Sequence, residues 1–449
     1  MAERKYCVAV VGGAGTWGRH YLRTYAAHPD CEIVGLVDRA RDRRQAFAER
    51  YGVQATYDRV EDLLSVVVPD VVSAIVPVSH NFAVVRACAE AGVRVVSCEK
   101  PISAELSEAD DMVALCRERG TLLGCGQTAW AAPRMPQVVQ WVRDGNIGRP
   151  TVAAIPGGLP VEVSGGGCVQ LAALRILTGM EVEWAEGWEL PPVPGYVAPG
   201  TPPVEADAPM YGRLGLSGGI VCEILQPPEH HTGCVASVTG ENGQVWLTHP
   251  EPVLIQGTGA AAVPVRLDPG DDGHHDFFGP TIQRLLDAFD TGAEPASSGH
   301  DLRQSLEIAI ALKLSAADGH ARVRLPLPDR SHRLLPHPYR LHGGDVAGWQ
   351  SIGYEGPPQV PASLAKLTSF EQLGSLSRHD LHLLLQEVDH GDMVLALLGS
   401  SPMLQKRIFW TVSDRLAGFI REQLQARAST PTAVTEAARN RILEIARRL

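Results

Sequence analysis

The sequence predicts an α/β protein with a doubly wound parallel sheet in its N-terminal part and a helical module at its C-terminal end. Apolar runs of strand length alternate with stretches of helix length over residues 1–125. A glycine-rich turn directly follows the first apolar run. Residues 364–449 contain almost no glycine and place leucines three and four residues apart, which is typical of packed helices.

The size and composition of the chain favour more than one domain. It has 449 residues, of which 45% are hydrophobic and 20% are charged. Single hydrophobic cores stop growing near roughly 250–300 residues, so we expect two or three cores. The formal net charge of −11 leaves no broad basic surface, and we therefore expect no nucleic-acid partner.

Cysteine usage and hydrophobicity predict the compartment. The nine cysteines are scattered through apolar runs without a CxxC pair or the spacing of metal ligands, so we expect reduced thiols. The N-terminus enters a strand without a secretory pattern, and no run approaches the roughly 20 apolar residues of a membrane helix. We expect a cytoplasmic protein without a membrane partner.

The first strand and the turn after it predict a dinucleotide site. Residues 6–11 form a continuous apolar run that leads into Gly13-Ala14-Gly15-Thr16-Trp17-Gly18. The glycines allow a tight turn and close approach of backbone to pyrophosphate, and a helix over residues 17–27 would direct its N–H groups at the phosphates. Gly12 opens a second register, with Gly12, Gly15 and Gly18 as the spaced glycines.

The end of the second strand bears on the choice of cofactor. Residues 32–37 form an apolar run that ends in Asp38. The number of residues between the glycine turn and Asp38 is typical of an acid that binds the adenosine ribose hydroxyls. This acid slightly favours NAD. Arg39 and Arg43 could instead receive a 2′-phosphate, so NADP stays open.

Two later strands end in polar turns at the same predicted edge of the sheet. The strand over residues 71–76 leads into Pro77 and His80, and the strand over residues 93–98 leads into Glu99-Lys100-Pro101. Ligands of such sheets lie beyond the carboxyl ends of the strands, so we expect all of these residues at the cofactor. The other expected elements are helices over 41–51, 60–64, 82–91 and 109–119 and a strand over 122–125.

Taken together, these motifs resemble the Gfo/Idh/MocA oxidoreductases over residues 5–326. The resemblance rests on the glycine turn, Asp38, residues 89–96 running into Cys98-Glu99-Lys100-Pro101-Ile102, and the stretch 144–150, Asp-Gly-Asn-Ile-Gly-Arg-Pro. It implies a Rossmann-type domain over 1–125 and an α+β domain over 126–328 that has an open, mostly antiparallel sheet and forms a homo-oligomer. It also implies that Lys100 polarises a substrate oxygen or nitrogen, with Glu99 orienting it.

Residues 126–328 are compatible with this second domain, since strand-like segments alternate there with Gly/Asn turns. The expected strands are 151–155, 210–216, 219–225, 234–239, 244–248 and a last one within 322–326, and the expected helices are 277–289 and 301–317.

The chain departs from the resemblance where the chemistry would lie. Most relatives follow Gly-Gly-Gly with an aspartate and, four residues later, a histidine that takes the hydroxyl proton. After Gly165-Gly166-Gly167, counting forward finds Leu171 and Arg175, and counting back from Gly179 finds Gly165 and Val169. General acid–base catalysis typically contributes roughly 10²- to 10⁴-fold to the rate, so loss of the histidine should severely slow oxidation of a sugar alcohol. Reduction of an imine or a conjugated system needs less help from a base, and the biliverdin and thiazolinyl imine reductases, which resemble this family, work without the usual pair. A reductase is therefore as plausible as a sugar dehydrogenase.

Other residues are weaker candidates. Gln127, Trp130 and Arg134 follow a strand end and are expected to line the substrate pocket, with ordinary packing as the alternative. The pairs His230-His231 and His274-His275 have no third ligand at a sensible spacing, so we expect no metal site.

Two single residues are candidate replacements for the absent pair. His231 is a candidate base, and Cys168 is a candidate nucleophile for which no partner can be named.

The C-terminal part divides into two segments. Residues 329–363 are rich in Pro, His and Gly and are expected to form a linker or a strap over the enzyme domain. Residues 364–449 predict short helices that begin near Ser377 and Asp392 and span 402–412, 414–426 and 432–449.

This last segment resembles the helical repeat of the flagellar motor switch protein FliG. The matching stretches are 384–389 (Leu-Leu-Gln-Glu-Val-Asp), 395–399, 413–415, 421–422 and 442–449. The resemblance implies a module that binds a protein partner. We therefore expect an NAD(P)-dependent oxidoreductase with an atypical active site, tethered to a partner; the alternative is a catalytically silent nucleotide-binding scaffold or sensor.

Overall fold

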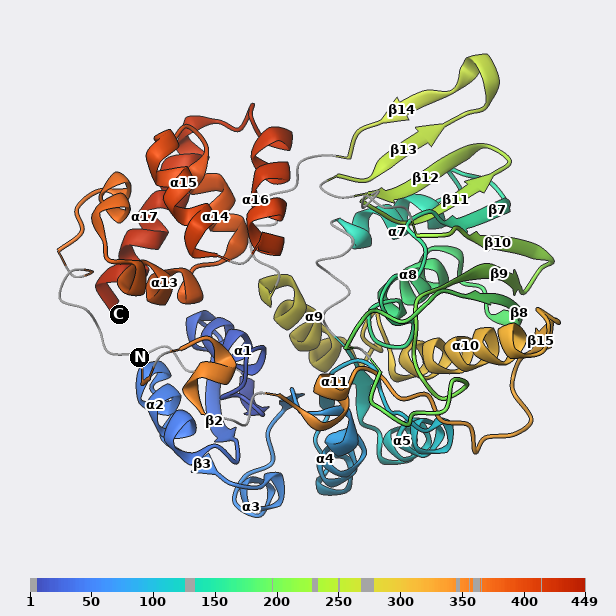
Figure 1. Cartoon of the computed structure of the whole chain (residues 1–449), viewed down its shortest axis with the longest axis horizontal. Helices are drawn as coiled ribbons and strands as arrows, with labels where there is room; N and C mark the ends of the chain where they lie inside the picture. The colour runs from blue at the N-terminus through green and yellow to red at the C-terminus, as the bar shows by residue number, and fades with distance from the viewer. Residues whose placement is uncertain are drawn as a thin grey trace. The chain divides into compact units, whose positions relative to one another are not determined.

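The alternating strands and helices of the N-terminal part, coloured blue to cyan in Figure 1, form a six-stranded parallel sheet in the order β3-β2-β1-β4-β5-β6. Its strands and helices are β1 (Tyr6–Val11), α1 (Gly18–Ala27), β2 (Cys31–Val37), α2 (Arg41–Tyr51), β3 (Thr56–Tyr57), α3 (Val60–Leu64), β4 (Val71–Ala74), α4 (Val78–Ala91), β5 (Val95–Cys98), α5 (Leu106–Arg119) and β6 (Leu122–Gly124). Strands covered by helices on both faces explain the continuous apolar runs. The strand order reverses at β1, between β2 and β4, and ligands of such sheets bind at this point.

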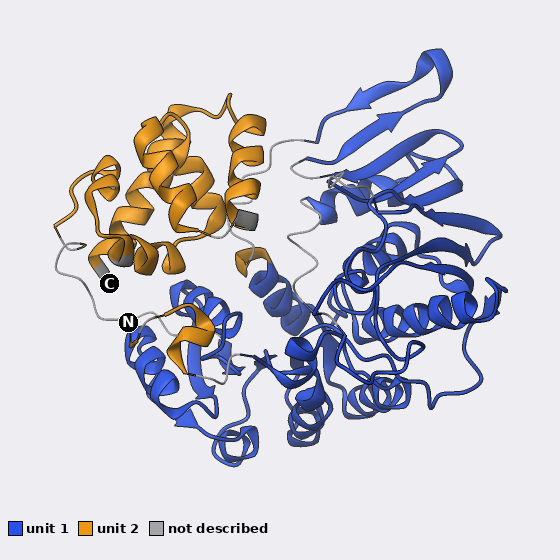
Figure 2. Cartoon of the chain, in the orientation of Figure 1, with its two compact units in different colours: residues 1–269, 281–346 blue, residues 270–280, 347–449 orange. Residues whose placement is uncertain are grey.

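The computed structural model describes residues 6–125, 134–195, 197–227, 233–248, 251–267, 278–344, 348–354, 356–357, 364, 366–412 and 414–448. The chain forms two compact units, one of residues 1–269 and 281–346 and the other of residues 270–280 and 347–449 (Figure 2). Both sheets belong to the first unit.

Helix α4 begins four residues earlier than the periodicity predicts. Pro77 is its N-cap residue, so the stretch from Val78 to Asn81 forms the first helical turn rather than a loop. Proline is readily accepted at a helix start because its fixed φ suits the backbone there. His80 and Asn81 are thereby held on a helix at the carboxyl edge of the sheet.

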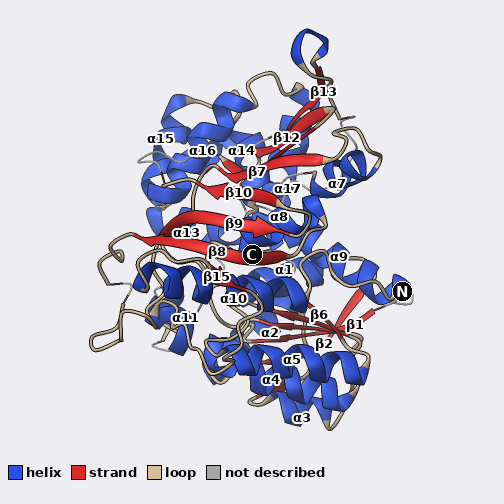
Figure 3. Ribbon diagram, turned by 90° about the vertical axis from the view of Figure 1, so that its right-hand side faces the viewer, coloured by secondary structure: helices blue, strands red, loops and turns tan. Residues whose placement is uncertain are grey.

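The second sheet has nine strands in the order β14-β13-β12-β11-β7-β10-β9-β8-β15 (Figure 3). Its strands are β7 (Pro150–Ile155), β8 (Val182–Glu189), β9 (Met210–Leu216), β10 (Ile220–Ile224), β11 (Cys234–Gly240), β12 (Gly243–Thr248), β13 (Val253–Gln256), β14 (Val263–Val265) and β15 (Val323–Arg324). The predicted antiparallel character holds for every recorded pair except β7 with β10, which is parallel. The fold class predicted from the sequence is confirmed.

Helices cover one face of this larger sheet. The helices of this region are α7 (Met135–Arg143), α8 (Cys168–Thr178), α9 (Phe278–Thr291) and α10 (Gly299–Ala317). Helix α10 packs against β8 of the large sheet, against α8, and against α5 and β6 of the parallel sheet. Its start is a capping box in which Ser298 and Asp301 exchange hydrogen bonds, so its N-terminus is well defined. One continuous core therefore joins both sheets.

Residues 327–344 follow β15 and lie along the first unit as a strap. Arg330 pairs with Asp110 at 2.7 Å and also with the buried Glu307. The backbone N–H of Leu334 donates to the Ala104 carbonyl at 2.8 Å, and that of Leu335 donates to the Glu205 carbonyl. The strap ends in the short helix α11 (Pro338–His342). This much of the expected linker or strap is fastened to the first unit at several points.

The described helices of the second unit are η2 (Trp349–Ile352), η3 (Phe370–Ser375), α13 (Arg378–Glu387), α14 (His390–Leu397), α15 (Pro402–Thr411), α16 (Asp414–Ala426) and α17 (Thr432–Arg448). Helices α13 to α17 lie close to their predicted positions, whereas η2 and η3 were not predicted. The start expected at Asp392 is wrong. Asp389 caps α14 by accepting from the N–H groups of Gly391 and Asp392, while the Asp392 carboxylate binds Arg441 of α17. The leucines form the separate core of this unit.

None of the helices in the described part of the chain is long and apolar enough to cross a membrane.

Candidate functional site

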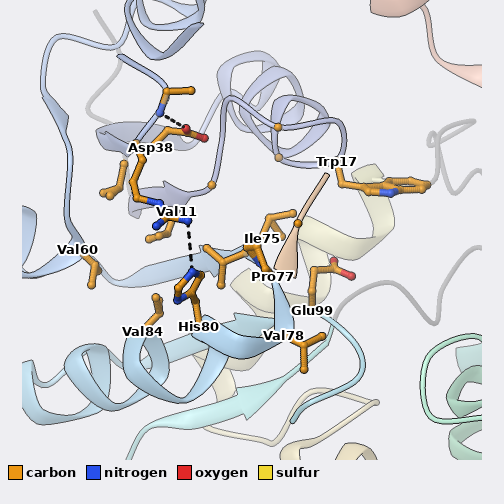
Figure 4. Close-up of a pocket in the computed structure, with 18 of the residues that line it drawn as sticks. Val11, Trp17, Asp38, Val60, Ile75, Pro77, Val78, His80, Val84 and Glu99 are labelled. Atoms are coloured by element: carbon orange, nitrogen blue, oxygen red, sulfur yellow. Dashed lines mark hydrogen bonds between the residues drawn. The ribbon is translucent and has the colours of Figure 1, made fainter. Parts of the chain in front are cut away.

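A cavity of about 760 Å³ opens at the carboxyl edge of the parallel sheet. Figure 4 shows Asp38 and His80 on one side of it and Trp17 and Glu99 on the other. Nine of the residues predicted from the sequence to form the site line this cavity: Gly15, Trp17, Gly18, Asp38, Arg39, Pro77, His80, Glu99 and Lys100. The glycine turn and Lys100 thus line one shared space.

The glycine turn contacts the cavity in the second of the two registers. Gly12, Gly15 and Gly18 line the cavity, whereas Gly13 and Thr16 do not. A Cβ at Gly18 would lie 2.1 Å from the carbonyl oxygen of Gly12, so only glycine allows the helix start to approach the strand end this closely. A Cβ at Gly13 would lie 2.4 Å from Leu36 Cδ1, which makes Gly13 a packing residue.

The carboxylate of Asp38 holds the glycine turn by hydrogen bonds to the backbone. Its Oδ2 accepts from the Ala14 N–H at 2.9 Å, and its Oδ1 accepts from the Ala40 N–H at 2.8 Å. Burial raises the pKa of this carboxyl, and these two hydrogen bonds oppose the rise. Asp38 therefore fixes the glycine turn and also lines the cavity.

Arg39 and His80 close the same side of the cavity. Arg39 Nη2 lies 3.3 Å from His80 Nε2, a contact drawn in Figure 4. Burial and the neighbouring guanidinium lower the pKa of His80, so its ring is neutral at pH 7 and can accept this hydrogen bond. Arg43, which is almost fully buried, also lines this side.

The loop that carries Lys100 is held by the buried amide of Asn81. Asn81 Nδ2 donates to the carbonyl oxygens of Glu99 at 3.1 Å, Pro101 at 3.1 Å and Ile102 at 3.2 Å. Lys100 is only 9% exposed. A buried anchor on a helix thus fixes the backbone on both sides of the lysine.

The carboxyl of Glu99 lies beside this lysine. Tyr21 Oη donates to Glu99 Oε1 at 3.4 Å. Burial raises the pKa of Glu99, while Lys100 and Arg340 act in the opposite direction. Glu99 and Lys100 are both on the cavity wall, where a bound molecule could exchange hydrogen bonds with them.

The strap adds residues that the sequence did not single out. Tyr339, Arg340, Gly343 and Gly344 line the cavity from α11 and the residues after it. Arg340 Nε binds Oε1 of Glu162, whose side chain is 1% exposed. Pro338 directly after His337 is a helix-start signal that would have placed α11. No local signal indicates that a residue 178 positions from Glu162 would be its partner.

The loop before α8 is built around Asp207. Its carboxylate accepts from the Val163 N–H at 2.7 Å and from the N–H and hydroxyl of Ser164 at 2.8 and 2.5 Å. Burial, and next the charge of Glu162, raise the pKa of Asp207 to about 6. Asp207 therefore holds the loop that places Glu162, and sequence patterns gave no indication of it.

The positions counted from the three glycines lie in α8 or just before it. Leu171 and Val169 are buried in the core. Arg175 pairs with Asp301 at 2.8 Å and Glu181 at 2.9 Å. Cys168 begins the helix, and burial raises the pKa of its thiol to about 11, so the thiolate form is scarce at pH 7.

Arg134 is the one expected substrate residue that lies within the described part of the chain. Arg134 precedes α7, where it pairs with Glu251 at 3.1 Å, and it is not part of the cavity lining. Gln127 and Trp130 lie outside the described residues, as do His230, His231, His274 and His275. Among the residues that the structure describes, no group of three potential metal ligands occurs.

Comparison with known families identifies two domains in the chain. Residues 7–127 match the oxidoreductase family with an NAD-binding Rossmann fold, Gfo/Idh/MocA, and residues 364–449 match the FliG C-terminal domain. These matches confirm both resemblances inferred from sequence motifs, the first over residues 7–127 and the second over residues 364–449.

Curated relatives match one domain at a time. D-apiose dehydrogenase of Paraburkholderia graminis is 30% identical over 138 residues, which is 31% of this chain and 36% of that protein. The flagellar motor switch protein FliG of Thermotoga maritima is 32% identical over 95 residues, 21% of this chain and 28% of that protein. The chain thus spans well under half of the length of these relatives.

Solved structures resemble a larger share of the chain. Aldose-aldose oxidoreductase from Caulobacter crescentus, complexed with glycerol, superposes with a TM-score of 0.58 at 20% identity over 72% of this chain and all of that chain. An oxidoreductase from Agrobacterium radiobacter in complex with NAD⁺, L-tartaric acid and magnesium gives a TM-score of 0.56 at 18% identity, covering 71% and 98%. At such identities the likeness shows the fold.

Proposed function

We propose that this chain is an NAD(P)-dependent oxidoreductase that transfers hydride between a dinucleotide and a small molecule in the cavity described above. The observation that carries the proposal is the meeting of the glycine turn and Lys100 in one cavity at the point where the strand order reverses. The match of residues 7–127 to an oxidoreductase family supports it.

The residues present fit a dinucleotide. Gly12, Gly15 and Gly18 leave backbone without side chains at the start of α1, where a pyrophosphate would meet helix N–H groups. Asp38 at the end of β2 would accept from ribose hydroxyls, which favours NAD. Arg39 and Arg43 on the same wall keep NADP as the alternative. When bound, the nicotinamide supplies or accepts the hydride.

The protein residues would supply binding and a proton. Lys100 would donate a hydrogen bond to the oxygen or nitrogen that gains or loses a proton, and burial strengthens this interaction. Asn81 and Glu99 would hold the lysine loop in place. Because the usual Asp/His pair is absent, reduction of a carbonyl, imine or conjugated system needs less base help than oxidation of an unactivated alcohol.

Trp17 offers a direct test, because it lines the cavity and is 47% exposed. NADH and NADPH are titrated against tryptophan fluorescence, with Trp17→Phe as the control for the origin of the signal. We expect binding in the micromolar range, with NADH favoured. Binding of neither nucleotide below millimolar concentrations, measured by calorimetry as well as fluorescence, would refute the proposal.

Assembly is a second part of the proposal. The outer face of the large sheet carries Trp184, Trp188 and Tyr211, with Trp188 stacked on Tyr211 at 5.9 Å between ring centroids. Aromatic residues of this kind are enriched in interfaces, and we propose that a second copy covers this face. The FliG-like module would bind a different protein partner. Sedimentation velocity of Trp188→Glu against the natural chain tests the first point.

The match of residues 364–449 to the FliG C-terminal domain also favours a second candidate function. In this case the chain is a catalytically silent nucleotide-binding scaffold or sensor that assembles partners through its helical module. A broad panel of carbonyl and imine substrates separates the two functions. Turnover that Lys100→Ala abolishes supports the enzyme, whereas nucleotide binding without any turnover supports the scaffold.

A further inference from the structure

Arg340 brings a second cation into the cavity near Lys100. It lies on the strap, between the two stretches that match known families, and it lines the cavity together with Glu99 and Lys100. Both Lys100 and Arg340 act electrostatically on the carboxyl of Glu99 and on the thiol of Cys168. The two cations therefore both lie near Glu99 at the cavity.

Arg340 is oriented by a buried carboxylate. Its Nε binds Glu162 Oε1, and the other oxygen of Glu162 accepts from the His337 N–H at 3.0 Å. Glu162 thus holds both the guanidinium and the residue that caps α11. The side chain of Arg340 is 36% exposed, so it is partly open to the cavity although its stem is anchored.

The anchoring leaves most of the guanidinium donors available. Arginine has five N–H donors, and Nε contributes one of them. Across the described part of the chain, Nη1 and Nη2 of Arg340 donate no hydrogen bond to a protein group. Terminal nitrogens arranged in this way match the two oxygens of a carboxylate.

The local charge balance favours one negative charge over two. Lys100 and Arg340 face Glu162 and Glu99, and a phosphate dianion would add two charges beside these acids. A carboxylate adds one charge and is planar, as the guanidinium is. A neutral sugar offers hydroxyl oxygens that can accept hydrogen bonds from the guanidinium, but it brings no negative charge to make these bonds charge-assisted.

We infer that the terminal nitrogens of Arg340 bind a carboxylate next to the reacting group that Lys100 contacts, so that the substrate is a small organic acid. This inference rests on the proposed function, because it names the substrate class of the same cavity. It assigns Arg340 a role in positioning and specificity, and it makes the strap part of the substrate site.

The test compares two probes that differ in one group. Glycerate and glycerol share a three-carbon skeleton, but glycerate carries a carboxylate in place of one hydroxymethyl group. Binding of each to the full chain is measured by calorimetry, with and without saturating NADH. We expect glycerate to bind at least about tenfold more tightly than glycerol, as a charge-assisted bidentate contact requires.

Four variants locate the effect. Arg340→Met should remove the preference for glycerate and leave NADH affinity within about twofold, and Arg340→Lys should restore part of it. Because Arg340→Met alone leaves Glu162 buried beside a lost partner, the double variant with Glu162→Gln provides a folded alternative with the same expected loss. Arg333→Met is the matched control, since Arg333 lies on the same strap but pairs with Glu105 at 3.3 Å outside the cavity.

Glu162→Gln alone separates binding from structure. The terminal nitrogens of Arg340 remain in this variant and a competing negative charge is lost, so glycerate should bind as tightly as before or more tightly. Equal binding of glycerate and glycerol by the natural chain would overturn the inference. Arg340→Met weakening NADH as strongly as glycerate would also overturn it, because the arginine would then serve the cofactor. Failure of NADH to bind at all would count against the proposed function, while the glycerate comparison without NADH would still decide this inference.

Discussion

Replacing Asn81 by alanine should loosen the loop that carries Lys100. The Nδ2 group of Asn81 has two hydrogens, which it shares among the carbonyl oxygens of Glu99, Pro101 and Ile102. Two buried neutral hydrogen bonds at about 1–1.5 kcal/mol each give a loss of about 2–3 kcal/mol in the free energy of unfolding. A displacement of Lys100 by about 1 Å would lower kcat by roughly 10²-fold.

Urea unfolding and kinetics measure the two effects separately. The unfolding transition of the first unit should shift to lower urea concentration in Asn81→Ala. The affinity for NADH should change little, because Asn81 does not hold the glycine turn. Asn146→Ala is the control: this amide donates to the Trp141 carbonyl at 2.8 Å but lies near the surface, so it should cost about 1 kcal/mol or less. Unchanged stability and unchanged turnover in Asn81→Ala would show that the amide does not position the lysine.

Three further predictions concern other parts of the chain. In Gly18→Ala the new Cβ would lie 2.1 Å from a backbone oxygen, so the affinity for NADH should fall at least about tenfold. In the control Gly418→Ala the new Cβ meets open space, so the affinity should stay unchanged. Equal affinity of the two variants for NADH would contradict the proposed role of the turn. The pKa of Asp207 is about 6 in the folded chain, whereas its ordinary value is 3.8. The folded state therefore binds more protons than the unfolded state between these two values. As a result, the free energy of unfolding should fall as pH rises from 4 to 6, by at most about 3 kcal/mol. Asp207→Asn should abolish this part of the pH dependence, and an identical urea-midpoint profile in both proteins would refute it. Tyr354→Phe removes a buried 2.9 Å hydrogen bond to the Glu387 carboxylate and should destabilise the second unit by about 1.5–3 kcal/mol, as a shift of the α-helical melting transition would reveal.

Local patterns were sufficient for five of the six strands of the parallel sheet and for the glycine turn, whereas the two-residue strand β3 was not predicted. Each buried strand is a short apolar run, and each turn after it carries residues whose chemistry is visible without a structure. The same applies to α16, predicted over 414–426 and found over these residues. Where signals conflicted, the prediction was less complete: β8 was missed because its glutamates and tryptophans alternate across a half-exposed face without a clear strand pattern.

Long-range contacts explain what could not be predicted at the site. Arg340 and Glu162 are brought together by the path of the strap, and neither position carries a local motif. Asp207 is similar, because its role depends on the N–H groups of a loop more than 40 residues earlier. Helix α8 was missed for another reason: it is apolar on nearly all sides, so the periodicity of a surface helix is lost.

The two borders of the nine-stranded sheet limit how copies of this chain can join. At one border, β14 contains Pro264, which has no N–H to offer an incoming strand. At the other, β15 is only two residues long and ends in Arg324. Short, charged or proline-containing borders resist edge-to-edge addition. Growth of the sheet into a fibre by hydrogen-bonded extension is thus disfavoured.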